Sequence, residues 1–154
     1  EQGDSLGEFI ELYNAGKVPV DLGGFSLTQA IQFTFPQGIW IRPDEYILVA
    51  KDAAWYDFPG TQVFQWDDGK LSNSGEEIRL QDRYGNPIDS VLYGSSIPWP
   101  VSPNGSGYTL SLSNPTRDNS NPENWFRSIE IGGTPGSDNH LEQGSTNVEN
   151  WNYF

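Results

Sequence analysis

Apolar and polar residues alternate along Glu8–Asn14, near the start of the chain. In an extended backbone, Ile10 and Leu12 fall on one face and the residues between them fall on the other. This alternation predicts a β-strand that ends in a turn. The run Tyr46–Ala50 is the most apolar part of the chain. A continuous apolar run of this length predicts a central strand that is buried on both faces.

Short extended segments separated by Gly- and Pro-rich turns make up most of the remaining chain. These segments are Val18–Leu22, Phe25–Leu27, Phe33–Phe35, Ile39–Ile41, Val63–Phe64, Glu77–Gln81, Ile88–Tyr93, Tyr108–Leu112 and a last one that opens at Trp125. About nine short strands predict an all-β domain, with a β-sandwich as the leading architecture and an up-and-down barrel as the alternative. Helix content is expected to be very low, with one helical turn or a packed loop within residues 51–60.

The chain divides by character into a domain at residues 1–139 and a linker or tail at residues 140–154. Leu141–Asn147 is polar and typical of a linker. Val148–Phe154 is aromatic again, and three interpretations stay open: the start of a strand, a piece of a further domain, or an added segment. The chain begins at Glu1 and contains no Met, so we expect a processed product or an excised fragment.

The charge balance narrows the possible partners. The 154 residues carry 21 Asp and Glu against 8 scattered Lys and Arg, a formal net charge of −13. A nucleic acid or an anionic membrane surface requires a basic cluster that neutralises phosphates, so neither is an expected partner. Cations, neutral glycans and proteins stay as candidates. No run is long enough to cross a bilayer as a helix, and the absence of Cys excludes disulfides and thiolate metal sites.

Catalytic side chains are sparse in this sequence. The single histidine, His140, lies at the start of the tail, where nothing would hold it beside Ser137 and Asp138 as a catalytic triad requires. The acidic pairs Asp67–Asp68 and Glu76–Glu77 could serve a glycosidase only if both carboxylates faced one substrate. Neighbours on a strand point to opposite faces. We therefore expect both pairs to be solvated turn charges, and we expect no enzymatic activity.

The loop that follows residue 117 is rich in side-chain oxygens. Calcium binds carboxylate and amide oxygens of this kind, often in loops, and the candidate ligands are Asp118, Asn119, Asn121 and Glu123. The spacing lacks the Gly and Glu positions of a helix–loop–helix calcium site. The alternative interpretation is a loop whose Asx turns satisfy the local backbone, and the sequence favours it. No other cofactor is expected.

Aromatic residues make up 14% of the chain and include six Trp. Most are expected to fill the sandwich, because large rings dominate protein cores. Trp99, in the loop Ile97–Pro100, is the best candidate for an exposed ring that stacks on a sugar, because loops carry functional side chains. Trp55 and Tyr56 are the next candidates for such binding.

Glu11 places a charge between two aromatic residues of the first expected strand. A half-buried carboxylate needs partners that offset its lost hydration. We expect backbone N–H groups of a neighbouring loop, or an arginine, to hold Glu11 in a structural role.

Four stretches of the chain, each a weak signal alone, agree in order and spacing with one protein family. They are Glu8–Asn14, Val20–Leu27, Leu71–Glu76 with its hairpin through Asp89–Gly94, and Gly133–Gly136. Together, over residues 8–139, they resemble the lamin-tail domain, the immunoglobulin-like domain of nuclear lamins and of many bacterial secreted proteins. The resemblance implies an immunoglobulin-like β-sandwich and an exported bacterial module, extracellular or in the cell envelope. It implies no catalytic activity.

The chain departs from the family pattern at its beginning. Family members usually start with a strand that ends in an Asn-Glu pair, and only residues 1–7 precede the first motif here. The aromatic tail from Val148 could supply this strand within one chain or between two chains, so a homodimer formed by strand exchange is an open expectation. The heptad rod and the basic patches of a nuclear lamin tail are absent from the sequence.

These observations lead to two functional expectations. The first is a non-catalytic, exported interaction or anchoring module that binds a protein or cell-surface partner, favoured by the acidic composition and the resemblance. The alternative is a glycan-binding module built on exposed aromatic rings, with or without the help of calcium.

Overall fold

The computed structural model describes residues 7–101, 103 and 105–139 of the chain. This part is all-β, with twelve strands and no α-helix. Three of the strands have only two residues, which leaves nine longer strands, the number expected from the sequence. The expectations about strand exchange and about a linker or tail at 140–154 lie outside the described residues and stay predictions.

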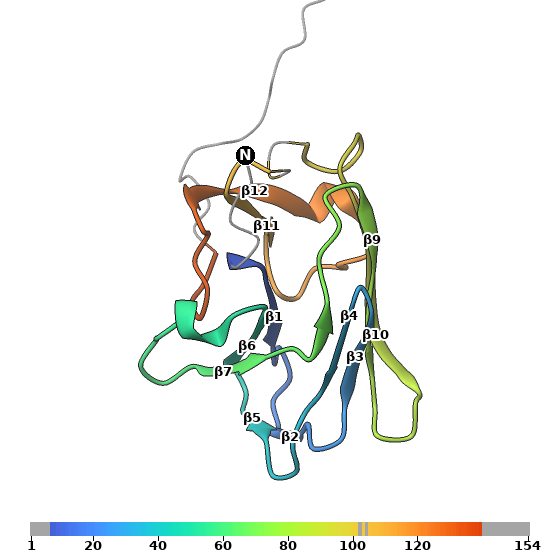
Figure 1. Ribbon diagram of the computed structural model, residues 1–154, viewed down its shortest axis with the longest axis vertical. Coiled ribbons are helices and arrows are strands. Elements are labelled where there is room, and N and C mark those ends of the chain that lie inside the picture. The colour runs from blue at the N-terminus through green and yellow to red at the C-terminus, as the bar shows by residue number, and fades with distance from the viewer. Residues whose placement is uncertain (1–6, 102, 104, 140–154) are drawn as a thin grey trace, which may run out of the picture.

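Two sheets stand against each other, the larger on the right and the smaller on the left of the core in Figure 1. Both sheets have open edges, so the fold is the expected sandwich and not a closed barrel. The smaller sheet has the order β1 (Phe9–Tyr13), β6 (Tyr46–Ala50), β7 (Gln62–Gln65). The larger sheet has the order β10 (Pro87–Gly94), β9 (Gly75–Gln81), β3 (Ser26–Gln29), β4 (Ile31–Thr34), β8 (Asp68–Gly69).

Two short strand pairs close the ends of the sandwich (Figure 1). The pair β2 (Val20–Asp21) and β5 (Trp40–Ile41) lies at the lower end of the view, and the pair β11 (Tyr108–Leu112) and β12 (Trp125–Ile131) lies across the upper end. Two single 3₁₀ turns, η2 (Ala53–Trp55) and η3 (Pro122–Asn124), lie in the connections. The helical turn expected within residues 51–60 is therefore present as η2.

Strand β6 is central in the smaller sheet, with β1 antiparallel on one side and β7 parallel on the other. Ile47, Leu48, Val49 and Ala50 are fully buried. Because successive side chains of a strand point to opposite faces, both faces of β6 are covered. The sequence-based prediction of a central strand buried on both faces is confirmed.

Three phenylalanine rings join the two sheets across the inner face of β6. Phe33 and Phe35 come from the larger sheet and its extension, and Phe64 comes from β7 in the smaller sheet. The ring centroids of Phe64 lie 5.8 Å from Phe33 and 5.6 Å from Phe35. Edge-on and tilted contacts of this kind add to the burial of apolar area. Ile47 and Val49 complete this core.

The closing segment, residues 132–139, covers the outer face of the smaller sheet. Its Gly136 N–H donates a hydrogen bond of 2.6 Å to Oε2 of Glu11, which is the register partner of Leu48. The Tyr46 hydroxyl donates a bond of 2.6 Å to Asp138. The expectation that a backbone N–H of a neighbouring loop holds Glu11 is confirmed.

Glu11 is a carboxyl group placed where ionisation is unfavourable. Burial raises the pKa of Glu11 to about 7, although the hydrogen bond from Gly136 acts in the opposite direction. The group is thus protonated in the folded chain at pH values where it is ionised in the unfolded chain. The carboxyl that joins the closing segment to β1 therefore changes its protonation state near pH 7.

We expect alanine at Ile47 or at Leu48 to lower the free energy of unfolding by about 2–5 kcal/mol each, because each change leaves a cavity in a fully buried layer. The two side chains lie on opposite faces of β6. Leu92→Ala is the matched control, because the Leu92 side chain is 70% exposed and its loss should cost under about 0.5 kcal/mol. Urea denaturation followed by tryptophan fluorescence measures all three. A cost for Leu48→Ala as small as that of the control would show that the outer face is not packed.

We expect the free energy of unfolding to fall as the pH rises from about 4.5 to about 7, since the folded chain binds more protons than the unfolded chain in this window. After a discount for partial exposure of Glu11, the raised pKa corresponds to roughly 2–3 kcal/mol. Glu11→Gln should flatten the profile. Denaturation at a series of pH values measures it.

Glu45→Gln serves as the control for this profile. The backbone N–H and guanidinium of Arg42 hold the pKa of Glu45 below its usual value, so Glu45 titrates below the window. The slope between pH 4.5 and 7 should persist in this variant. A slope that also persists in Glu11→Gln would assign it to another group.

Candidate functional site

An open groove of about 560 Å³ lies at the end of the larger sheet where β9 begins and β10 ends. One wall comes from the start of β1, and the other comes from the tight corner that leads into β9. We call this feature the corner groove. It is lined by Glu8, Lys70, Leu71, Ser72, Asn73, Ser74 and Ser95.

Side-chain hydrogen bonds hold the corner at residues 71–76 in one shape. Oε1 of Glu76 accepts a hydrogen bond from the Ser72 N–H, and the Tyr93 hydroxyl lies 3.0 Å from the same oxygen. Burial, and then the neighbouring Glu76 carboxylate, raise the pKa of Tyr93, so its hydroxyl stays a donor. Gly75 has φ +95°, and a Cβ there would lie 2.5 Å from the Tyr93 carbonyl oxygen. The corner is therefore a rigid wall that requires glycine.

The acidic pair Glu76–Glu77 differs from the expectation of two solvated turn charges, because both residues are half-buried. Glu76 holds the corner, and Glu77 forms an ion pair with Arg79 at 2.7 Å. Glu77 shares a face of β9 with Arg79, two positions away, whereas its neighbour Glu76 points to the opposite face. The two carboxylates therefore do not face one substrate. The other pair, Asp67–Asp68, is exposed as expected.

Glu8 fixes the opposite wall of the corner groove. Its Oε2 accepts a hydrogen bond of 3.1 Å from the Leu71 N–H, and its Oε1 lies 3.8 Å from Nζ of Lys51. Glu8 thus joins the start of β1 to the corner and balances the charge of Lys51. The wall is built from residues 8 and 71, which the sequence places far apart.

Two of the predicted binding residues, Trp55 and Tyr56, lie beside this wall. The Trp55 side chain is 52% exposed at the end of η2. Tyr56 is half-buried, donates a hydrogen bond of 2.6 Å to the Gly7 carbonyl oxygen, and packs edge-on against Phe9. Burial raises the pKa of Tyr56 to about 12. Tyr56 therefore supports the structure, whereas Trp55 offers a free ring.

Trp99 is not the exposed ring that the sequence suggested. It is half-buried, its ring centroid lies 5.9 Å from that of Trp125, and its Cδ1 would lie 2.8 Å from a Cβ at Gly94. The side chain of its loop that stands out is Ile97, which is 89% exposed. Trp99 packs inward because a glycine on β10 leaves room for the indole. A binding role for Trp99 stays a prediction.

The candidate calcium loop satisfies its own backbone. Oδ1 of Asp118 accepts hydrogen bonds from the Ser120 N–H at 2.9 Å and from the Ser120 hydroxyl at 2.6 Å, which lowers the pKa of Asp118. Asn121 caps η3 by accepting from the Glu123 N–H, and Asn119 donates its amide to a carboxylate on β10. Among the described residues, no group of three or more His, Cys, Asp and Glu is placed to hold a metal. Calcium binding here stays a prediction.

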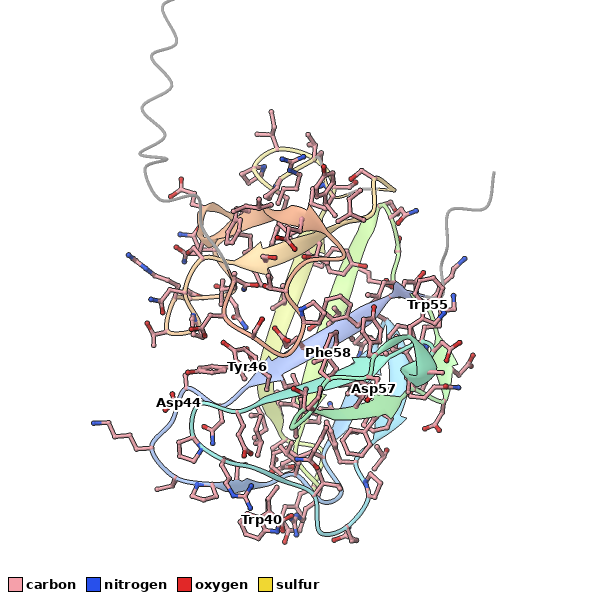
Figure 2. All side chains as sticks on the ribbon, turned by 90° about the vertical axis from the view of Figure 1, so that its left-hand side faces the viewer. Trp40, Asp44, Tyr46, Trp55, Asp57 and Phe58 are labelled. Carbon is pink, nitrogen blue, oxygen red and sulfur yellow. The ribbon has the colours of Figure 1, made fainter. Side chains whose placement is uncertain are left out.

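A second exposed surface lies at the other end of β9 and β10. Tyr84 is 83% exposed, and Trp40 is 50% exposed. Nη2 of Arg83 lies 2.9 Å from Oδ2 of Asp21, and Asp21 is the strand partner of Trp40, so these residues gather on one surface. We call Asp21, Trp40, Arg83 and Tyr84 the hairpin end. Figure 2 shows Trp40 at the lower edge of the molecule, away from Trp55.

The loop that carries Tyr84 is held in place by Asp82. The Asp82 carboxylate accepts hydrogen bonds from the backbone N–H groups of Tyr84 and Asn86, both at 2.8 Å, and from the Asn86 amide at 2.9 Å. The sequence predicted this hairpin loop, and a large aromatic residue in a turn was the available signal for an exposed ring. The exposure of Trp40 was not predicted, because its isoleucine neighbours indicated a strand and gave no sign that the indole is exposed.

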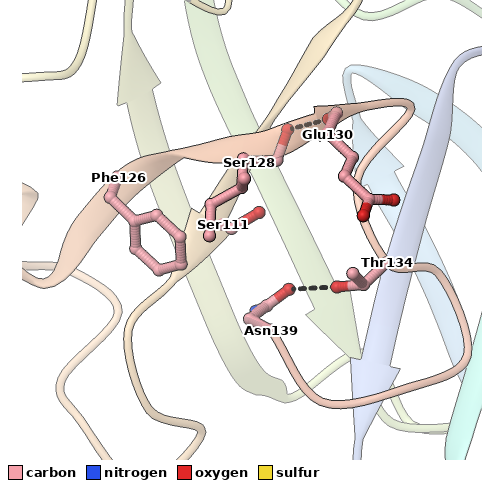
Figure 3. Close-up of a pocket in the computed structure, with 7 residues that line it drawn as sticks. Ser111, Phe126, Ser128, Glu130, Thr134 and Asn139 are labelled. Carbon is pink, nitrogen blue, oxygen red and sulfur yellow. Dashed lines mark hydrogen bonds between the residues drawn. The ribbon is translucent and has the colours of Figure 1, made fainter. Parts of the chain in front are cut away.

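A small cavity of about 100 Å³ lies between β11, β12 and the closing segment (Figure 3). Several of its polar groups already have hydrogen-bond partners. The Ser128 hydroxyl donates to the Glu130 carbonyl oxygen at 2.7 Å, and the Thr134 hydroxyl donates to the Asn139 side-chain oxygen at 3.1 Å. A water molecule occupies roughly 30 Å³ in the liquid, so the space suits a few waters and not a substrate.

No helix among the described residues has the length and apolar character needed to span a bilayer. No curated protein matches the chain. The family model of the Lamin Tail Domain matches residues 1–95, which is more than half of the 154 residues. Its match includes the stretches at Glu8–Asn14, Val20–Leu27 and Leu71–Glu76, and stops before Gly133–Gly136. With its all-β sandwich and this match, the chain belongs to the lamin tail domain family.

Proposed function

We propose that the chain is a non-catalytic interaction module that binds a protein partner through the hairpin end. The observation that carries the proposal is the pair of exposed rings, Trp40 and Tyr84, which flank the ion pair of Asp21 and Arg83. Tryptophan, tyrosine and arginine dominate the binding energy of protein interfaces, because they bury large areas and still form polar contacts.

The hairpin end presents these rings on a rigid frame. The three hydrogen bonds accepted by Asp82 fix the loop of Tyr84, and the Gln62 amide donates a bond of 2.9 Å to the Trp40 carbonyl oxygen. A surface that is ordered before binding loses little conformational entropy when the partner docks. The geometry therefore favours docking of a folded partner over a role as spacer.

The charge of the whole chain favours a partner with a basic surface. A net charge of −13 attracts positive surfaces and speeds their encounter, and this effect weakens with salt. An exported position, outside the cell or in the envelope of a bacterium, is part of the proposal. It is supported by the resemblance to bacterial secreted domains.

We expect a Trp40→Ala/Tyr84→Ala double variant to bind its partner at least about tenfold more weakly, because the loss of even one interface hot spot, about 2 kcal/mol or more, exceeds the 1.4 kcal/mol that corresponds to tenfold. Cross-linking in envelope extracts of the source cell identifies partner proteins. The purified partner is then titrated with each variant by calorimetry. Trp55→Ala is the matched control, because its exposed indole lies outside the hairpin end.

Equal binding of the double variant and the parent chain would remove the hairpin end from the proposal. Turnover of a substrate by the pure chain, abolished by a single carboxylate substitution, would replace the proposal with an enzyme. Unfolding midpoints of all variants should agree, since the substituted side chains are half-exposed or more.

A further inference from the structure

The closing segment, residues 132–139, is joined to the rest of the chain by few contacts. It contains no strand, so no ladder of backbone hydrogen bonds runs between it and a sheet. Three side-chain hydrogen bonds of 2.6–3.0 Å dock it, and they join Gly136 to Glu11, Asp138 to Tyr46, and Asn139 to the Leu112 carbonyl oxygen. A segment held by so few bonds opens at a lower free energy than a core strand.

The closing segment is built as a compact loop on a glycine hinge. At its base, Gly132 and Gly133 have φ angles of +82° and +70°, which glycine adopts and leaves at little cost. Within the segment, the Ser137 N–H and the Ser137 hydroxyl both donate to the Thr134 carbonyl oxygen at 3.1 Å. The Thr134 hydroxyl bonds to Asn139 at 3.1 Å. These internal bonds stay intact when the loop moves as one piece.

The two sides of the closing segment are packed differently. Toward β11 and β12, the small cavity of about 100 Å³ lies between the segment and Ser128 (Figure 3). Toward the smaller sheet, the segment covers the outer face of β6, where Leu48 is fully buried beside its register partner Glu11. Opening therefore breaks few contacts on the cavity side, and its main effect is to uncover Leu48.

Glu11 is the docking residue whose charge changes near neutral pH. Burial raises the pKa of Glu11 to about 7, and the hydrogen bond from Gly136 opposes this shift. When the segment opens, water reaches the carboxyl and its pKa returns toward the ordinary value of 4.5. The docked state is thus favoured most when Glu11 is protonated, and this preference fades as the pH rises from about 4.5 to about 7.

Two tyrosines and two aspartates are the titratable groups around Glu11 in β1, in β6 with the turn before it, and in the closing segment. Burial, the hydrogen bond to Asp138 and the charges of Asp138 and Glu11 raise the pKa of Tyr46. The hydrogen bond to Asp44 is the largest cause that raises the pKa of Tyr13, whose ring centroid lies 4.7 Å from that of Tyr46. Both hydroxyls therefore stay neutral near pH 7. No ion pair in the described part of the chain includes Glu11 or Asp138, so ionised Glu11 has a carboxylate near it and no paired cation.

We propose that the closing segment is a pH-sensitive strap over the smaller sheet. It stays docked while Glu11 is protonated, and it opens at the Gly132–Gly133 hinge when Glu11 ionises. Ionisation in the docked state leaves a carboxylate away from water and close to the Asp138 carboxylate, and opening removes both penalties. The surface that opening uncovers is the apolar outer face of β6. No residue of the hairpin end belongs to this device, so it goes beyond the proposed function.

Hydrogen exchange of the full 154-residue chain, followed by mass spectrometry from about pH 5 to about pH 8, tests the proposal. Each exchange rate is divided by the intrinsic rate at the same pH, which gives a protection factor. Protection of the closing segment should fall at least about tenfold over this range, because one unit of pKa difference corresponds to tenfold. It should also lie below the protection of Tyr46–Ala50 at every pH, since the segment opens without global unfolding.

Two variants assign the titrating group. Glu11→Gln keeps a side-chain oxygen that accepts from the Gly136 N–H but cannot ionise, so protection of the closing segment should lose its dependence on pH. His140→Gln is the matched control, because the single histidine of the chain follows the closing segment directly and titrates in the same window. The pH dependence should persist in this control. Agreement of the unfolding midpoints at about pH 5 shows that both variants are folded like the parent chain.

Three results would overturn the proposal. Equal protection of the closing segment and of Tyr46–Ala50 would show that the segment opens only when the whole domain unfolds. Protection of the segment that stays constant with pH would remove the switch. A pH dependence that Glu11→Gln retains, or that His140→Gln loses, would assign the titration to a group other than Glu11.

Discussion

The burial of both faces of β6 is the constraint on which the rest of the structure depends. A strand without an exposed face requires a packed layer on each side. The larger sheet supplies the inner layer through Phe33 and Phe35, and the closing segment supplies the outer layer over Leu48. This outer layer brings a backbone N–H to Glu11, the one charge that β1 places on that face. The middle of the sandwich is thereby occupied, so the ends of the strands carry the exposed aromatic and unpaired polar groups.

The residues that match the family model are fewer than the residues that pack together in the structure. The family match ends at residue 95, yet Tyr46 and Glu11 bond to Asp138 and Gly136. Without these later residues, the outer face of β6 would lose its cover and Glu11 its donor. The burial of Glu11 in the first strand therefore depends on the closing segment, which covers it and donates its hydrogen bond. The division into a domain at residues 1–139 and a tail at 140–154 stays a prediction.

Sequence patterns predicted the features that depend on residues close together in the chain. They failed for side chains whose burial depends on residues far away in the chain. The run Tyr46–Ala50 identified the central strand because alternation and apolarity are local properties. The prediction that Trp99 is an exposed ring was wrong. Gly94 leaves the space for the indole and Trp125 packs against it, and no local pattern connects these two residues to Trp99. Glu76 was likewise assigned to solvent because its partner Tyr93 lies on the next strand. Only the structure brings residues 8 and 71 together as a groove.

The two candidate surfaces share an electrostatic property. At each surface a carboxylate is paired with a basic residue, Asp21 with Arg83 at the hairpin end and Glu8 with Lys51 beside the corner groove. A pair of opposite charges within a few ångströms has a weak net field at close range, while the surplus negative charge of the whole chain still attracts a basic partner from farther away. A ligand can then approach either end without working against the full net charge of −13. The rigid strands β9 and β10 join the ends, so both surfaces can be occupied at once without competing for the same residues.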